Sequence, residues 1–95
     1  MTNPDRVILF KKALDAFVEV EQSKPDYPPY VSIHNQLLYL IAIAEGTRKD
    51  KEKLEKINLG VLTMREVETG HEKVADLLYE AAGQADVMTT EALIE

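Results

Sequence analysis

The two histidines are the first candidates for catalytic or metal-binding residues, because imidazole can carry protons or bind metals near neutral pH. His34 and His71 stand far apart, and neither belongs to a His-x-x-x-His or Glu-x-x-His pair of metal ligands. The glutamates near His71 could form a carboxylate–imidazole pair, but acidic residues at a helix N-terminus are explained more simply by the helix dipole. We therefore expect both histidines to be structural, with His34 partly buried.

Other catalytic patterns are missing as well. The four glycines are spread too widely to build a phosphate-binding loop, and the chain has no cysteine. No serine or lysine has the neighbours of an activated nucleophile. Glu66 and Glu68 are two residues apart, so on a helix their carboxylates diverge. The sequence predicts no enzyme, no cofactor and no metal site.

The net charge of the chain indicates which classes of partner it can bind. The chain has 11 basic and 17 acidic residues, for a net charge of −6. Such a surface repels nucleic-acid phosphate on average and attracts a basic protein, although acidity also simply aids solubility. The basic stretch at residues 48–56 is interrupted by three acids and is typical of a solvated helix face. We expect a protein partner and no nucleic acid.

The longest apolar run, Leu37–Ala44, predicts the helix around which the other helices pack. On a helix it puts apolar side chains on every face, which indicates a buried central helix over Val31–Glu45. The run is shorter than the about 20 apolar residues that span a bilayer, so we expect no membrane partner. Residues 1–5 lack the layout of a signal peptide. We therefore expect a cytoplasmic protein.

A first flanking helix is predicted over residues 5–22, behind an Asn3 cap. Three prolines then end it and make residues 26–30 a stiff, extended connector. Within the connector, Tyr27 and Tyr30 either stay exposed, which suits a binding surface, or pack down over the end of the bundle. The sequence leaves both possibilities open.

A third helix follows Gly46, with Leu54, Ile57, Val61 and Met64 at helical spacing. Gly60 disfavours its interior. Either the helix kinks or breaks there, with Asn58 capping a second half, or it is continuous and Gly60 lets the central helix approach closely.

The last helix is predicted over residues 70–85, behind a capping box that Thr69 opens. Residues 86–95 are only weakly amphipathic and are expected to form a loose tail. The chain is then a single all-α domain over residues 1–95, an up-down bundle around the central helix. Its connectors place one acidic and aromatic set of residues at the same end: Asp26, Tyr27, Tyr30, Glu66 and Glu68. The opposite end is basic, with Arg6, Arg48, Lys49, Lys51 and Lys53.

Residues 57–68, together with Gln36–Leu40, resemble the small helical immunity proteins of type VI secretion systems that neutralise NAD(P)+ glycohydrolase effectors. In that family a Leu-Gly pair precedes an apolar helix that bears a basic residue, a glutamate, an apolar residue and an acid. The matching positions here are Leu59, Gly60, Arg65, Glu66, Val67 and Glu68. The resemblance covers about residues 36–82.

The resemblance implies an inhibitor that binds a cognate, ADP-ribosyltransferase-like toxin domain of a secreted effector. We expect the toxin to be contacted by Asp26, Tyr27, Tyr30, Glu66 and Glu68. Two other classes remain. A self-associating helical adaptor is suggested by the 45% apolar content, with the central helix extending into a homodimer interface. A small enzyme or ligand carrier would need ionisable side chains facing inward, and the helical patterns show none.

Overall fold

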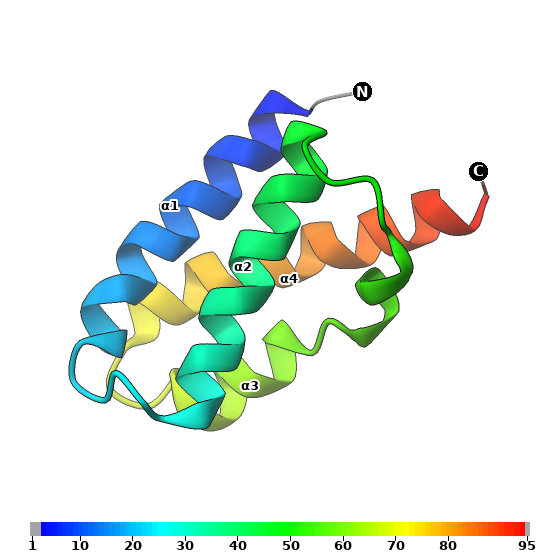
Figure 1. Ribbon diagram of the computed structural model, residues 1–95. Coiled ribbons are helices and arrows are strands. Elements are labelled where there is room, and N and C mark those ends of the chain that lie inside the picture. The colour runs from blue at the N-terminus through cyan, green and yellow to red at the C-terminus, as the bar shows by residue number, and fades with distance from the viewer. Residues whose placement is uncertain (1–2, 95) are drawn as a thin grey trace.

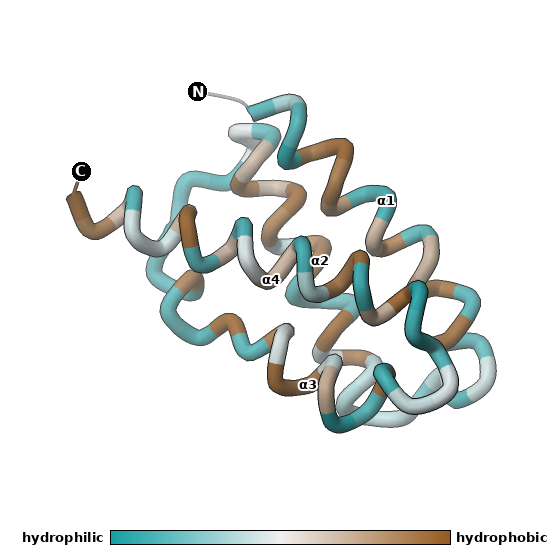
Figure 2. Tube along the Cα trace, turned by 180° about the vertical axis from the view of Figure 1, so that it is seen from behind, coloured by the Kyte–Doolittle hydropathy of each residue, from teal (hydrophilic) through white to brown (hydrophobic). Residues whose placement is uncertain are grey.

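The computed structural model describes residues 3–94 and shows α1 (Pro4–Glu21), α2 (Pro28–Glu45), a short 3-10 helix η1 (Glu52–Lys56), α3 (Leu59–Glu66) and α4 (Glu72–Leu93). No strand occurs within this range. α1 lies beside α2, and the longer α4 crosses behind them, with its first half against α3 (Figures 1 and 2). The predicted all-helical bundle is confirmed.

Several helix ends follow the expected local rules. The Asn3 side chain accepts a hydrogen bond from the backbone N–H of Arg6 at 3.1 Å and caps α1. Gly46 ends α2 with φ of 81°, in the left-handed region that glycine enters without a steric penalty. The extended connector predicted for residues 26–30 is wrong, because α2 already begins at Pro28. Proline suits the first turn of a helix, where its missing N–H would have no partner anyway.

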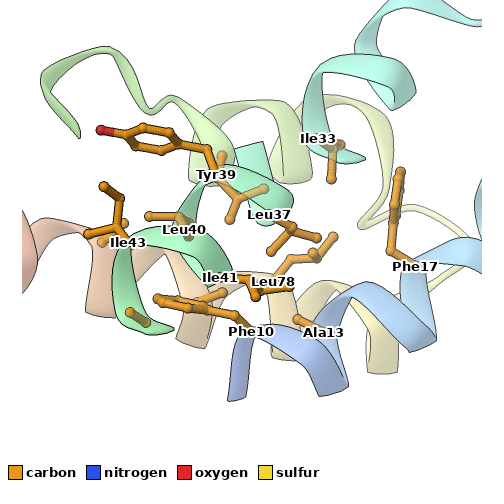
Figure 3. Close-up of a cluster of buried hydrophobic side chains, with 14 of the residues drawn as sticks. Phe10, Ala13, Phe17, Ile33, Leu37, Tyr39, Leu40, Ile41, Ile43 and Leu78 are labelled. Carbon is orange, nitrogen blue, oxygen red and sulfur yellow. The ribbon is translucent and has the colours of Figure 1, made fainter. Parts of the chain in front are cut away.

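α2 supplies much of the core, as expected, but one of its faces is open. Leu37 and Leu40 are fully buried and lie within the cluster of Figure 3, whereas Leu38 is 47% exposed and Val31 is 39% exposed. The prediction that the helix is buried all round is therefore wrong. α2 packs on α1 and α3, which cover only part of its circumference, so one apolar stripe remains at the surface.

The third helical segment is broken, as one of the two alternatives predicted. η1 ends at Lys56 and α3 starts at Leu59, with Asn58 at the N-cap position. The Asn58 side chain does not cap the helix; its Oδ1 accepts a hydrogen bond from Nε2 of Gln36 at 2.6 Å. The Gln36 side chain thereby ties α2 to the start of α3.

The break also changes which side of the segment is buried. Leu59 and Thr63 face the core, while Val61 and Met64, predicted on the inner stripe, are at least half exposed. A single helical period cannot continue through a 3-10 turn and an extended residue. A Cβ atom at Gly60 would lie 3.6 Å from the Cβ of Ala82, so the close neighbour is α4 and not the central helix.

α4 begins and ends later than predicted. Gly70 has φ of 91°, His71 occupies the N-cap position, and the expected Thr69 cap does not form. Residues 86–93, expected to be loose, continue the helix. Arg6 of α1 holds them, because its Nη1 donates to Oε1 of Glu91 at 2.7 Å. Ile94 follows as the C-cap of α4, and Glu95, the last residue of the predicted tail, lies outside the described residues.

Candidate functional site

Three of the five predicted site residues meet at one end of the bundle. The Tyr27 hydroxyl donates to Oε1 of Glu66 at 2.5 Å, and the Tyr30 hydroxyl donates to the backbone carbonyl of Glu66 at 3.3 Å. Tyr27 and Tyr30 flank the N-terminus of α2, and Glu66 is the last residue of α3. Two elements far apart in the sequence are thus joined through a single residue.

An aromatic stack supports this junction from the core outward. The rings of Phe17 and Tyr30 meet edge to face at 5.4 Å, and those of Tyr30 and Tyr27 meet in the same way at 5.0 Å. Lys24 covers the outer ring, with its Nζ 5.0 Å from the Tyr27 centroid. Tyr30 is only 5% exposed. Of the two possibilities open for the tyrosines, packing down over the bundle end is the one that occurs.

The Tyr27–Glu66 hydrogen bond dominates the electrostatics here. It raises the pKa of the Tyr27 hydroxyl above its usual value of 10.0, and desolvation of the ring adds to the shift. The neutral phenol is therefore the stable donor at physiological pH, and the Glu66 carboxylate is held in one orientation. Its second oxygen keeps capacity to accept from a partner.

The other two predicted residues lie apart from this contact. Glu68 is exposed just beyond α3 and acts on Tyr79, whose pKa is raised first by desolvation and then by the Glu68 carboxylate. Glu66 and Glu68 thus face different tyrosines, which confirms that their carboxylates diverge. Asp26 is exposed before α2, at the edge of a separate groove. We refer to Asp26, Tyr27, Tyr30, Glu66 and Glu68 as the acidic end.

The opposite, basic end surrounds a cavity of about 730 Å³ whose lining includes Arg6, Arg48, Lys49 and Lys51. Its charges are largely used within the fold. Arg6 binds Glu91 and also donates from Nε to Oε1 of Gln84 at 2.9 Å. The Arg6 hydrogen bond lowers the pKa of the Glu91 carboxyl, so this pair is ionised at neutral pH. These contacts fasten α4 to α1.

A groove that sequence reasoning missed lies between α2 and the segment that leads into α3. Its volume is about 870 Å³. Tyr39 marks its floor, with its hydroxyl pointing away from the core cluster toward the loop, where it donates to the backbone carbonyl of Asp50 at 2.7 Å (Figure 3). The groove is lined by Asp26, Pro28, Val31, Ser32, Asn35, Gln36, Tyr39, Arg48, Lys53, Lys56, Ile57 and Asn58.

The two histidines lie in separate parts of the fold. His34 is partly buried, as expected, with Nδ1 2.7 Å from Oε1 of Glu21. His71 is exposed at the start of α4. No group of three or more histidine, aspartate or glutamate side chains that could hold a metal ion occurs in residues 3–94. None of the helices over the same residues is long and apolar enough to cross a membrane.

Comparison with known proteins identifies the family of this chain. The family model Tsi6 matches residues 7–87, which include every residue of the acidic end. The chain belongs to the Tsi6 family. Tsi6 proteins are type VI secretion immunity proteins, and an immunity protein acts by binding a cognate toxin. Neither a curated protein nor a solved structure matches this Tsi6 family member significantly.

Proposed function

We propose that this Tsi6 family protein neutralises a toxin that hydrolyses NAD(P)+, or a related nucleotide, by covering the toxin's nucleotide-binding cleft with its acidic end. The observation that carries the proposal is the position of the segment resembling such inhibitors. Arg65, Glu66 and Glu68 end that segment inside the family match, and Glu66 accepts hydrogen bonds from both tyrosines of the pair. A cleft that binds phosphates carries positive charge, which an acidic surface complements.

The acidic end is built so that little order is lost on binding. Tyr27 and the edge-to-face stack fix the Glu66 carboxylate in advance, and a preorganised group loses less conformational entropy when a partner binds. In this assignment Asp26, Tyr27, Glu66 and Glu68 touch the toxin. Tyr30, nearly buried, supports Tyr27 from below. Nanomolar inhibition corresponds to about −12 kcal/mol of binding free energy.

The proposed mechanism is inhibition by binding alone, in the cytoplasm, with no catalysis, cofactor or metal from this chain. The first test is affinity capture of the tagged protein from its native host, with the bound effector identified by mass spectrometry. Its purified toxin domain is then assayed for NAD(P)+ hydrolysis. Inhibition that is complete at one equivalent supports the proposal. A bound toxin domain that does not consume NAD(P)+ or another nucleotide contradicts it.

Four variants separate the interface from the fold. Glu66→Lys with Glu68→Lys should weaken inhibition strongly. Glu19→Lys with Glu80→Lys makes the same charge change at exposed positions on α1 and α4, and should leave inhibition within about twofold.

Because Glu66→Lys also removes the partner of Tyr27, two further variants isolate the charge. Glu66→Gln keeps an oxygen that can accept from Tyr27, whereas Tyr27→Phe keeps the carboxylate and removes the donor. If the charge itself contacts the toxin, Glu66→Gln weakens inhibition more than Tyr27→Phe does. The reverse order would assign Glu66 to the fold.

A self-associating adaptor is the second candidate, and the exposed apolar side chains favour it. Leu38 on α2 and Val61 and Met64 on α3 are between 47% and 56% exposed. Light scattering on the purified protein distinguishes the two, since the adaptor requires a dimer in the absence of toxin and the inhibitor does not.

A further inference from the structure

The groove between α2 and the segment running through η1 has one wall that is regular and one that is irregular. α2 contributes residues from Pro28 to Tyr39, and the other wall comes from Arg48 and residues 53–58. Figure 1 shows the chain leaving the end of α2 and arching away from it before it returns to α3. Side chains from the loop and from α2 thus face one another across a space of about 870 Å³.

Hydrogen bonds join the two walls of the groove. Gln36 donates from Nε2 to Oδ1 of Asn58 at 2.6 Å, and its Oε1 accepts from the backbone N–H of Asn58 at 3.1 Å. Nε2 of Gln36 also donates to the Ser32 hydroxyl oxygen at 3.0 Å. These hydrogen bonds connect the two walls directly. Val31 and Ile57 line the same groove and add apolar surface to it.

The charges of the groove are divided along its length. Asp26 lies at the end near the start of α2, while Arg48, Lys53 and Lys56 lie toward the other end. Arg48 is engaged, with an ion pair to Asp50 at 3.6 Å and its guanidinium 4.8 Å from the Tyr39 ring centroid. Lys53 and Lys56 are exposed, and neither forms an ion pair with a described acidic side chain.

The basic cavity at the end of the bundle is different in this respect. There Arg6 is neutralised by Glu91 and fastens two helices together. In the groove, two ammonium groups face solvent beside apolar surface. Such a combination has the features of a recognition site: an apolar contact for one side chain and cations for the carboxylates beside it.

We infer that this groove binds an extended acidic segment of the cognate toxin, with an apolar side chain placed against Val31 and Ile57 and carboxylates at Lys53 and Lys56. The inference rests on the proposed toxin binding and adds a second contact to it. The α2 wall from Pro28 to Tyr39 is about 16 Å long. That length matches roughly five residues of extended chain at about 3.3 Å each.

Two contacts of opposite sign would give the complex one orientation. The acidic end faces a basic surface of the toxin, and the groove faces an acidic segment of it. A toxin rotated on the interface would bring like charges together, which is unfavourable. Asp26 stands where the two surfaces meet, because it belongs to the acidic end and also lines the groove.

The test compares two double variants of equal charge change against the purified toxin domain. Lys53→Glu with Lys56→Glu reverses the groove, and Lys12→Glu with Lys73→Glu reverses two exposed lysines on α1 and α4. We expect the groove variant to bind at least tenfold more weakly and the control variant to stay within about twofold. Circular dichroism on both confirms that the helices are retained.

A photo-crosslinking amino acid at Asn35, which is exposed and lines the groove, locates the occupant directly, and the same group at Lys12 is the control. Crosslinks from position 35 to a toxin segment rich in aspartate or glutamate support the inference. Crosslinks between two copies of this chain, or to a segment without acidic residues, overturn it.

The outcomes separate this inference from the proposed function. If wild type inhibits the toxin and the groove variant binds as tightly as wild type, the groove inference is wrong and the proposed function stands. If the groove variant loses binding while Glu66→Lys with Glu68→Lys inhibits normally, the groove is the contact and the acidic end is not.

Discussion

The acidic end and the groove adjoin one another at the first turn of α2, yet they are built in opposite ways. At the acidic end, Tyr27, Tyr30 and Glu66 bind one another and rest on Phe17. In the groove, the cationic side chains of Lys53 and Lys56 extend from a short 3-10 helix into solvent. The side chains of the acidic end are fixed before a partner binds, whereas the lysine side chains of the groove can change conformation when it binds.

The difference shows that the effect of mutating a surface group depends on whether that group has a partner within the fold. A carboxylate held by a tyrosine contributes to stability as well as to binding, so mutating it reports on both. An exposed lysine without a partner contributes little to stability, because isolated surface charges rarely do. Substitutions of Lys53 and Lys56 should therefore change binding alone, and those of Tyr27 and Glu66 should change both properties.

Removing the aromatic support gives the largest expected effect. Phe17 is fully buried, and Phe17→Ala should lower the free energy of unfolding by about 3–5 kcal/mol. Val31→Ala in the groove, by contrast, should cost less than about 1 kcal/mol, because Val31 is already 39% exposed. Urea denaturation followed by circular dichroism measures both. Equal losses would contradict the contrast between the two regions.

The two faces of α2 extend the same contrast along one helix. Leu40→Ala should cost about 2–5 kcal/mol, since Leu40 is fully buried, and Leu38→Ala less than about 1 kcal/mol, since Leu38 is 47% exposed. Both substitutions make the same change in helix propensity, so the difference reports burial only. A large loss at Leu38 in the purified monomer would show that α2 is covered on its outer face.

Substitutions of two glycines compare a strained backbone position in the turn near the acidic end with an unstrained position inside α4. Gly70 has φ of 91°, so Gly70→Ala should destabilise the protein by about 1–2 kcal/mol. Gly83 lies within α4 with no atom within 4 Å of a Cβ atom built on it. Gly83→Ala should stabilise the protein by about 0.5–1 kcal/mol. Thermal unfolding of both variants should shift in opposite directions.

The smallest expected effect concerns pH. Because the pKa of Tyr27 is raised in the folded protein, its contribution to stability is complete below about pH 10 and decreases as pH rises through the folded-state pKa. Tyr27→Phe should therefore reduce the loss of stability above pH 10, as measured by urea unfolding between pH 9 and 11. Tyr79→Phe is the comparison, since its shifted hydroxyl lies next to Glu68 and not Glu66. An unchanged alkaline slope in Tyr27→Phe would show that the Glu66 hydrogen bond is weak.

The sequence by itself determined the elements whose causes are local. Asn3 and Gly46 act as caps through their own side chain or backbone, and the helical spacing of apolar residues predicted α1 and most of α4. The break before α3 was one of two alternatives that the sequence left open, and Gly60 itself lies in the first turn of α3. The convergence of the α1–α2 and α3–α4 connectors followed from the antiparallel order of the segments.

Only the tertiary structure decided which apolar residues stay exposed and which polar groups meet. Leu38 and Leu40 have the same side chain two positions apart, and their burial differs because α1 and α3 cover only one side of α2. The part of α4 beyond Ala85 is held by Arg6, which lies 85 residues away from its partner Glu91. The Tyr27–Glu66 bond and the groove of Lys53 and Lys56 likewise join segments that no local pattern relates. Contacts between distant segments are fixed by packing, which a single sequence does not display.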